Sequence, residues 1–278
     1  MTHPAKYEVE VRDVEYQSIG GKSWPLRIYQ PKGDGPFPAI IDVHGGAWHN
    51  GDRTNNAGID HALAAQGILV AAVEFRQPPE AGYPASVCDI NLATRWLKAH
   101  AAEYQISTKV GAFGNSSGGH QVVLSAMRPR HAAYASSPLA KSPQVDASLA
   151  YVIAGWPVIC PHYRFLYAKR INNQEHIKAH YDYWRTEEAM SEGSPQTICD
   201  SGEKIEMPPI LLLLKENDKN HPLEMEEKFV ASYRRRGGTM DVQMFSGLPE
   251  HRMVPSPDKP ETMRAMEIMT AFIRKHAG

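Results

Sequence analysis

Gly114-Asn115-Ser116-Ser117-Gly118 is the stretch of sequence that decides the fold. The apolar segment Lys109–Phe113 precedes it, and a helical pattern follows over Gly118–Met127. A strand that enters a tight turn between two glycines and continues as a helix presents the central serine hydroxyl at an exposed tip. Side chains at the flanking glycines would collide with the neighbouring strand and helix. We therefore predict that Ser116 is a nucleophile; the alternative is a turn whose glycines serve packing alone.

A second motif, a His-Gly-Gly loop at residues 44–48, follows the buried strand Ile40–Val43. Glycine leaves backbone N–H groups free of side-chain bulk, as a site that stabilises a developing oxyanion requires. We predict that the N–H groups of Gly46 and Ala47, together with that of Ser117, form this oxyanion hole. His44 is expected to hold the loop by hydrogen bonds rather than to transfer protons.

A serine nucleophile needs a general base, and the base needs a carboxylate that orients it. The apolar run Ile210–Leu214 indicates a strand buried on both faces, and Asp218 lies just past its end. The alternating segment Asp241–Phe245 indicates a final strand, and the loop after it contains His251. We predict that Asp218 is the orienting acid and His251 the base.

Competing residues exist for both roles. Glu216 lies two residues before Asp218, and His221 belongs to the same loop. The loop after the final strand is the expected position of the base, which favours His251. The order serine, acid, histidine is that of α/β-hydrolases and differs from the orders in the two common serine protease folds.

These motifs together resemble the hormone-sensitive-lipase-like small esterases of the α/β-hydrolase superfamily, a group that includes kynurenine-formamidase-like enzymes. The resemblance extends from about residue 25 to the end of the chain and includes Val73–Arg76, Tyr83–Ala85 and Asp89–Leu97. It departs from the family pattern at Ala47, where glycine is frequent, and at Ser117, where a small residue such as alanine is usual. Both residues keep the N–H that the oxyanion role requires.

The remaining patterns agree with an α/β fold. Alternating strands and helices imply right-handed crossovers and a mostly parallel eight-stranded sheet flanked by helices, with the first two strands an antiparallel pair at one edge. The expected strands are Glu8–Tyr16, Leu26–Gln30, Pro38–Val43, Ile68–Phe75, Val110–Phe113, Leu149–Ala154, Ile210–Leu214 and Asp241–Phe245. The expected helices are Asn56–Gln66, Ser86–Tyr104, Gly118–Met127, Leu223–Arg236 and Pro260–His276.

Residues 156–207 interrupt this alternation, after the sixth strand. The segment is rich in aromatic residues and contains a charged pattern, Arg170–Lys178, that we interpret as helical. We predict a cap over the substrate pocket, inserted into a single domain that spans residues 1–278. Its rings, at Tyr163, Phe165, Tyr167, Tyr181, Tyr183 and Trp184, either line a substrate cavity or pack the insertion onto the body.

Composition narrows the function classes. The chain has 278 residues, 42% of them hydrophobic, and a formal net charge of -1, so no basic stripe indicates nucleic-acid binding. No apolar run reaches the length of a membrane span, and the first residues lack a secretory signal. The three cysteines and the histidines show no metal-ligand spacing. We expect a cytoplasmic enzyme without cofactor or metal; the sequence leaves open whether it forms a homodimer.

The predicted activity is cleavage of a small-molecule carboxylic ester through an acyl-enzyme. The same residues would cleave an amide, lactone, carbamate or arylformamide, so these substrates stay open. A third alternative is a non-catalytic ligand-binding protein on the same scaffold, although such proteins tend to lose a member of the triad, and candidates for all three members are present here.

Overall fold

A computed structural model describes residues 7–216, 218–248, 255–256 and 258–278. Its centre is an eight-stranded sheet in the order β1-β2-β4-β3-β5-β6-β7-β8. The strands are β1 (Val9–Ile19), β2 (Lys22–Pro31), β3 (Ala39–Val43), β4 (Leu69–Val73), β5 (Gly111–Asn115), β6 (Val152–Gly155), β7 (Ile210–Lys215) and β8 (Met240–Phe245). The expectation of a mostly parallel sheet is confirmed, because only β1 with β2 and β2 with β4 pair antiparallel.

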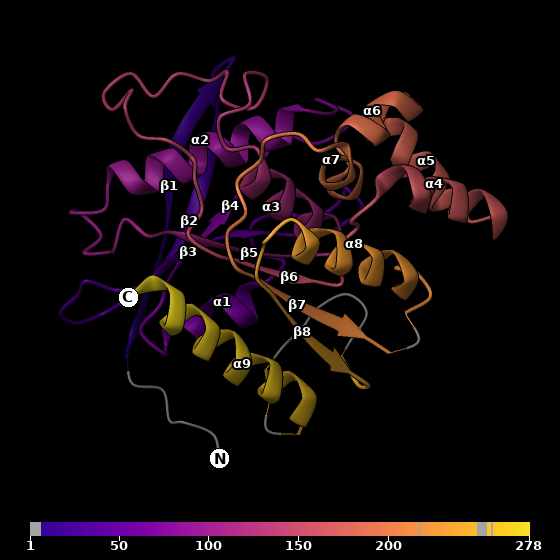
Figure 1. Cartoon of the computed structure of the whole chain (residues 1–278). Coiled ribbons are helices and arrows are strands. Elements are labelled where there is room, and N and C mark those ends of the chain that lie inside the picture. Colours follow the sequence, from indigo (N-terminus) through magenta and orange to yellow (C-terminus); the bar gives the residue numbers. More distant parts are fainter. Residues whose placement is uncertain (1–6, 217, 249–254, 257) are drawn as a thin grey trace.

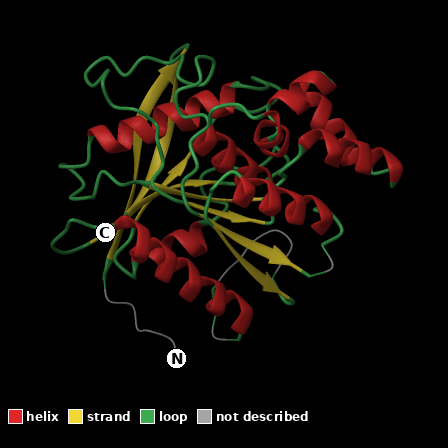
Figure 2. Cartoon of the chain, viewed as in Figure 1, coloured by secondary structure: helices red, strands yellow, loops and turns green. Residues whose placement is uncertain are grey.

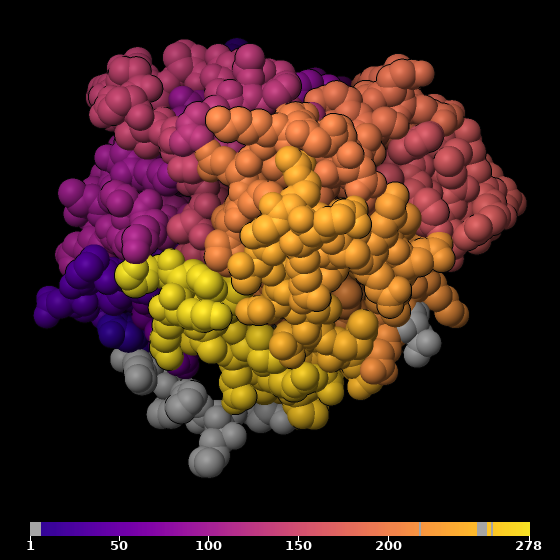
Figure 3. Space-filling view, viewed as in Figure 1, coloured from indigo at the N-terminus to yellow at the C-terminus, as the bar shows by residue number. Residues whose placement is uncertain are grey.

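Helices cover both faces of the sheet (Figures 1 and 2). Those expected from the sequence are α1 (Ala57–Ala64), α2 (Ala85–Ala99), α3 (Ser117–Met127), α8 (Leu223–Arg235) and α9 (Pro260–Ala277). Helices α1 and α9 lie on one face, and α2, α3 and α8 lie on the other. In the space-filling view, the C-terminal part of the chain, coloured orange to yellow, fills the centre of the visible side of the molecule (Figure 3).

Two separate apolar cores result from the period-two alternation of buried strands. In β4, Leu69, Ala71 and Val73 face the core with α2, α3 and α8, whereas Val70 and Ala72 face the core with α1 and α9. All five residues are fully buried, which explains why this strand is apolar throughout rather than alternating in its sequence.

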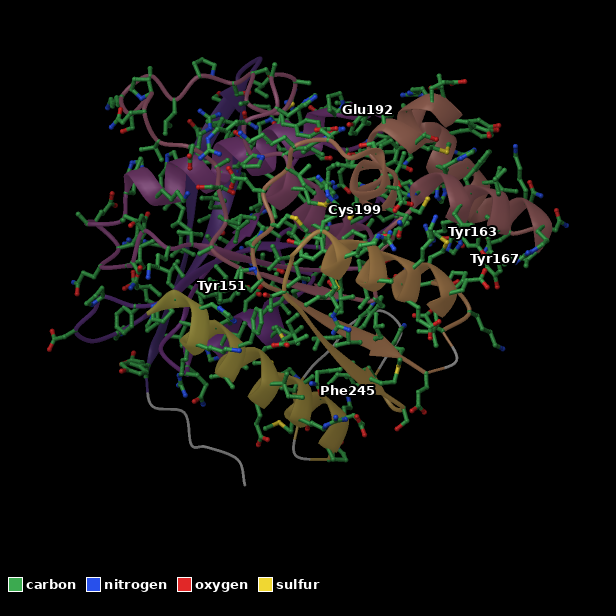
Figure 4. All side chains as sticks on the ribbon, viewed as in Figure 1. Tyr151, Tyr163, Tyr167, Glu192, Cys199 and Phe245 are labelled. Atoms are coloured by element: carbon green, nitrogen blue, oxygen red, sulfur yellow. The ribbon has the colours of Figure 1, made fainter. Side chains whose placement is uncertain are left out.

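Between β6 and β7 the chain forms four further helices: α4 (Pro161–Arg170), α5 (Gln174–Trp184), α6 (Glu187–Glu192) and α7 (Pro195–Ser201). Helices α4 to α6 gather at the side of the molecule toward which the arrows of β7 and β8 point (Figure 1). Tyr163 and Tyr167 lie on α4, at the outer end of this group (Figure 4).

The helix expected near Arg170–Lys178 is interrupted, because the chain turns at residues 171–173 between the end of α4 and the start of α5, which contains Gln174–Lys178. Asn172 has a φ of 56°, and the side chain of Asn173 caps α5 by accepting a hydrogen bond from the backbone N–H of His176. Asparagine tolerates the left-handed conformation and is a preferred N-cap, so these two residues end one helix and begin the next.

Strand pairing brings the two motifs of the sequence to one place. Val43 at the end of β3 pairs with Gly114 of β5, and Asn115 pairs with Gly155 at the end of β6. The loops that follow these strands therefore leave the same edge of the sheet side by side, as the carboxyl ends of parallel strands do.

Candidate active site

Ser116 occupies the sharp turn between β5 and α3. Its φ of 53° and ψ of -120° lie in a region that a serine rarely adopts. A Cβ on Gly114 would lie 2.6 Å from the backbone of Gly118, and a Cβ on Gly118 would lie 2.0 Å from the carbonyl oxygen of Val43. The glycines at both positions therefore permit the close approach of strand and helix on which the turn depends.

His221 lies within hydrogen-bond distance of the Ser116 hydroxyl. Its Nε2 is 3.1 Å from Oγ of Ser116, and its Nδ1 is 3.1 Å from Oδ2 of Asp218. Since an ionised carboxylate only accepts, Nδ1 carries the proton and Nε2 is left to accept from the serine hydroxyl. The three side chains thus form a continuous hydroxyl, imidazole and carboxylate relay.

Asp218 is held firmly in the turn after β7. Its Oδ1 accepts from the backbone N–H groups of Asn220 and His221, at 2.8 and 3.0 Å, and Nζ of Lys215 lies 3.2 Å from Oδ2. Burial alone would raise the pKa of Asp218, but the hydrogen bond from His221 and the neighbouring donors outweigh it and hold the pKa below its usual range. The carboxylate is therefore ionised at neutral pH.

Burial lowers the pKa of His221 to about 4, although the bond to Asp218 opposes this shift. The cationic guanidinium of Arg164 lowers it further. The imidazole is therefore neutral at pH 7, as a general base must be before it accepts a proton.

The sequence named a different histidine for this position. His251 lies outside the described residues, so its place as the base stays a prediction. His221 is the alternative base that the sequence also offers. Its signal is a histidine three residues after an acid, just beyond a buried strand. Glu216, the competitor of Asp218, is exposed, and its backbone N–H bonds the carbonyl of Phe245.

The His-Gly-Gly loop lies directly against the serine turn. A Cβ on Gly45 would lie 2.9 Å from the carbonyl oxygen of Asn115, and Gly46 has a φ of 120° that favours glycine. Ala47 also has a positive φ, of 51°. Within the described ranges, the backbone N–H groups of Gly46 and Ala47 have no hydrogen-bond acceptor. The N–H of Ser117 begins α3 and has no acceptor within the helix.

His44 holds the base of this loop. Its ring stacks on Phe75 with 4.4 Å between centroids, and its Nδ1 lies 2.7 Å from the carbonyl oxygen of Gly45. Burial lowers the pKa of His44, so the ring is neutral. These contacts agree with the expectation that this histidine is structural.

A pocket of about 390 Å³ opens above Ser116, which is large enough for a small ligand. Its wall combines the serine turn and the His-Gly-Gly loop with side chains of α4 and α5, and it is mainly polar. The lining residues are Gly45, Gly46, Ala47, Asn50, Gly51, Asn55, Asn56, Asn115, Ser116, Trp156, Arg164, Glu175, His176, Asn220 and His221.

Trp156, the first residue of the insertion, lines this pocket, but the six rings predicted from the sequence between Tyr163 and Trp184 do not. Phe165, Tyr183 and Trp184 are buried and pack with Trp48 and Met190 in a separate cluster. The ring of Trp48 stacks on Tyr183 at 5.5 Å and meets Trp184 edge to face at the same distance. Packing of the insertion onto the body, the second of the two expectations, is therefore the observed role of these rings.

No group of three or more His, Cys, Asp or Glu side chains is placed to hold a metal ion within the ranges that the structure describes. In those same ranges, no helix has both the length and the apolar character that crossing a membrane requires.

Several solved structures that share this architecture are esterases. Esterase B of Lactobacillus rhamnosis superposes with a TM-score of 0.77 at 22% identity, covering 98% of this chain and 89% of that one. An esterase of Pseudomonas putida gives 0.75 at 21% identity, covering 100% and 86%. At these identities the likeness establishes the fold, which is the predicted α/β-hydrolase fold.

A sequence model of the BD-FAE family matches residues 26–231, which is more than half of the chain. The chain belongs to the BD-FAE family. The matched range contains Ser116, Asp218 and His221 and ends before His251. The relay that the structure assembles therefore lies entirely within the part of the chain that defines family membership.

Curated relatives of this BD-FAE chain carry esterase names. Carboxylesterase NlhH of Mycobacterium tuberculosis is 34% identical over 116 residues, or 40% of this chain and 35% of the relative. Esterase LipC of the same organism is 26% identical over 204 residues, or 72% and 49%. An arylesterase of Saccharolobus solfataricus is 30% identical over 123 residues, or 44% and 40%. The chain thus spans less than half the length of each of these relatives.

Proposed function

We propose that the chain hydrolyses carboxylic esters through a covalent acyl-enzyme on Ser116. The single observation that carries this proposal is the relay of Ser116, His221 and Asp218 in the wall of a pocket. Beside the relay, the N–H groups of Gly46 and Ala47 lack acceptors within the described residues. The esterase names of the relatives support the same reaction.

In the first half of the reaction, Oγ of Ser116 attacks the ester carbonyl carbon while Nε2 of His221 takes the hydroxyl proton. The carbonyl oxygen becomes an oxyanion, which the N–H groups of Gly46, Ala47 and Ser117 stabilise. Each such donor contributes about 3 kcal/mol in comparable sites. Collapse of the intermediate breaks the bond to the alcohol, which leaves with the proton from the imidazole.

In the second half, water replaces the serine as the attacking group. The imidazole of His221 takes a proton from water, the hydroxide oxygen bonds the acyl carbon, and the bond to Oγ of Ser116 breaks. The carboxylic acid leaves and the serine regains its proton. Asp218 stays ionised throughout, holding the imidazole in one tautomer and stabilising the imidazolium that forms twice per turnover.

The base is the one role for which sequence and geometry name different residues. We assign it to His221 because both ring nitrogens of this residue have the contacts that a base requires. The alternative assignment to His251, which the sequence favours, leads to a different result on mutation of either residue, as set out below.

We also infer that residues 156–207 act as a cap within a single domain. Helices α4 and α5 supply Arg164, Glu175 and His176 to the pocket that contains Ser116. A molecule bound beside Ser116 would therefore contact side chains of the insertion, which supports this inference.

Replacing Ser116 by alanine tests the proposed function. We expect kcat/KM for 4-nitrophenyl butyrate to fall by about 10⁴-fold or more, and labelling by a fluorophosphonate probe to disappear. Ser125→Ala is a matched control, since Ser125 lies on α3, the helix that Ser116 precedes, and its hydroxyl has no partner in the described part of the chain.

Three other outcomes are informative. Undiminished ester turnover by Ser116→Ala would exclude the mechanism. Turnover of N-formylkynurenine with no activity on simple esters would identify an amide hydrolase that uses the same residues. A wild-type serine that fails to react with the probe would favour a binding protein instead of an enzyme.

A further inference from the structure

A buried arginine faces the nucleophile from the insertion. Arg164 lies on α4, its side chain is 5% exposed, and it contributes to the wall of the pocket that contains Ser116. Arginine is almost never so buried without a carboxylate partner, because removing an unpaired charge from water is costly. The contacts of this guanidinium therefore need a complete account.

Arg164 has only uncharged hydrogen-bond partners. Its Nε donates to the carbonyl oxygen of Asn220 at 3.3 Å, and its Nη2 lies 3.2 Å from a ring nitrogen of His176. Burial and the guanidinium itself lower the pKa of His176 to about 4, so this ring is neutral at pH 7 and accepts. The remaining nitrogen, Nη1, is buried and has no partner among the described residues.

Burial lowers the pKa of Arg164 and the charges of Asp218 and Glu175 oppose this shift, but neither carboxylate forms an ion pair with Arg164 in the described structure. Asp218 is already engaged by Lys215, His221 and two backbone N–H groups. Glu175 lines the same pocket but is exposed. Burial raises the pKa of Glu226 well above its usual range, and this side chain forms no ion pair with Arg164 in the described structure.

Its position in the pocket, rather than the lack of a carboxylate partner, distinguishes Arg164, because the buried Arg95 also has only uncharged partners in the described structure but does not line the pocket. On the same helix as Arg164, the exposed Lys169 forms an ion pair with Glu187 at 3.2 Å. The buried Arg164 has no carboxylate partner in the described structure. The guanidinium carbon also lies 5.9 Å from the centre of the Trp48 ring, which attracts a cation but carries no net charge. Burial lowers the pKa of Arg164 only to about 10, so it remains charged at pH 7.

We propose that Arg164 binds a carboxylate of the substrate, so that the preferred ester carries a second, anionic group in its acyl or alcohol part. This inference rests on the proposed ester hydrolysis and adds the chemical class of the substrate. Since Nε and Nη2 already have partners, Nη1 is the guanidinium nitrogen left to donate to a carboxylate, and a charge-assisted hydrogen bond of this kind is strong. Because Arg164 is buried, its charge is screened far less than that of the exposed Glu175, so the net effect of the two favours an anion.

The test compares substrates of equal length that differ in charge. One pair is 4-nitrophenyl hydrogen adipate and its methyl ester, which place the carboxylate on the acyl side. The other pair is 4-acetoxybenzoate and its methyl ester, which place it on the alcohol side. We expect the wild-type protein to prefer the anionic member of one pair by about tenfold or more in kcat/KM.

Arg164→Met should remove this preference. We expect the ratio of kcat/KM for the favoured anion to kcat/KM for its methyl ester to fall about 10- to 100-fold, mainly through KM of the anion. Arg164→Lys keeps the charge without the guanidinium and should retain part of the preference. Lys169→Met is the matched control, since it removes a surface cation from the same helix and should leave the preference intact.

Wild-type measurements keep the proposal testable if Arg164→Met fails to fold. Adipate should inhibit hydrolysis of the neutral ester competitively, and hexane-1,6-diol should not. The proposal is overturned if neither pair shows a preference and adipate does not inhibit, or if Arg164→Met lowers both members of a pair equally. If no ester is turned over at all, the proposed function fails, and calorimetry with adipate then tests the anion site separately.

Discussion

The two sides of the pocket are built in different ways. On the side of β3, β5 and α3, the decisive atoms are backbone atoms, and the geometry depends on how closely Gly114 and Gly118 let the main chain approach. On the side of α4, α5 and the turn after β7, the decisive atoms belong to the side chains of Arg164, His176 and His221. The first side fixes where a carbonyl can react, and the second fixes what can bind there.

This difference determines how each side responds to mutation. A backbone-built site fails through steric collision and loses stability together with activity. A side-chain-built site loses one interaction at a time and can lose activity while the fold stays intact. The predictions below use this contrast, from the largest expected effect to the smallest.

The largest effect should come from the imidazole. We expect His221→Ala to lower kcat/KM for 4-nitrophenyl butyrate by about 10⁴-fold, because no other described ring nitrogen lies within hydrogen-bond distance of Oγ of Ser116. His251→Ala should lower kcat/KM less than about tenfold. Steady-state kinetics of the two purified variants measures both values.

The pH profile of the wild-type protein checks this assignment independently. Since the base must be neutral, kcat/KM rises as pH increases through the pKa of the base, which for His221 is about 4. An acid limb near the ordinary histidine value of 6.5, combined with a large loss in His251→Ala, would move the role to His251.

An intermediate effect should come from the backbone-built side. In Gly118→Ala the new methyl group would lie 2.0 Å from the carbonyl oxygen of Val43 and 2.6 Å from that of His44. We expect a loss of about 3 kcal/mol or more in the free energy of unfolding, and a fall of about 10²-fold in kcat/KM because the oxyanion loop must shift. Denaturant unfolding and ester kinetics measure the two losses together.

Gly202→Ala is the control for this substitution. Gly202 has a φ of 77°, but a Cβ there would meet no atom within 4 Å. Backbone strain alone should cost about 1 kcal/mol and leave kcat/KM unchanged. Wild-type activity in Gly118→Ala would show that the loop does not depend on this close approach.

The smallest effect concerns the stability of the fold rather than the activity. Asp60 on α1 is fully buried, and neither of its carboxyl oxygens has a partner among the described residues. Burial raises the pKa of Asp60 well above its usual range, with Asp42 adding to the shift, and burial raises the pKa of Asp42 to about 7. Both groups keep a proton in the folded state at pH values where the unfolded chain has lost it, so stability falls as pH rises above about 4.

Asp60→Asn removes one of these protons from the balance. At pH 8 we expect the free energy of unfolding to rise by roughly 1–2 kcal/mol, which raises the melting temperature by a few degrees. At pH 4.5 the melting temperature should change little, and kcat/KM should be unaffected. Calorimetric melting at the two pH values measures the difference. An equal change at both, or a lower melting temperature at pH 8, would contradict the proposed protonation.

Much of the sheet was predictable because buried strands have a strong local signal. The run Ile210–Leu214 and the alternation in Asp241–Phe245 fixed β7 and β8 to within one residue. Helix ends were predicted less well: the expected Ser86–Tyr104 ends at Ala99 in α2, because the chain leaves the helix at His100. The glycine motif was informative for the same reason as the strands, since its steric requirement is local.

The insertion was harder because its helices are short and mostly polar on their outer faces. Their starts do have local signals, which the periodicity of apolar residues does not reveal. The side chains of Asn173, Thr186 and Ser194 each cap a helix, and Pro161 and Pro195 stand at first helical positions. Capping residues would therefore have divided this segment better than its charge pattern did.

The identity of the base was not decided by sequence because two histidines satisfy the same order along the chain. The distance from Oγ of Ser116 to Nε2 of His221 is the observation that favours His221, which closely follows the acid, over His251, which follows the last strand. Likewise, the unpaired state of Arg164 depends on contacts between α4, α5 and the turn after β7. The cytoplasmic location stays a prediction, and the sequence leaves the oligomeric state open.

The turn after β7 carries both Asp218 and His221, and the backbone N–H of His221 bonds the same carboxylate that its ring contacts. A displacement of this turn would move acid and imidazole as one body, leaving their mutual contact intact. Ser116 follows a different strand, so the contact that such a displacement would break is the one between Oγ of Ser116 and Nε2 of His221. A small shift of this turn would therefore be enough to interrupt proton transfer from Ser116 to His221. Its return would restore the relay, because the contact between Asp218 and His221 would not have changed.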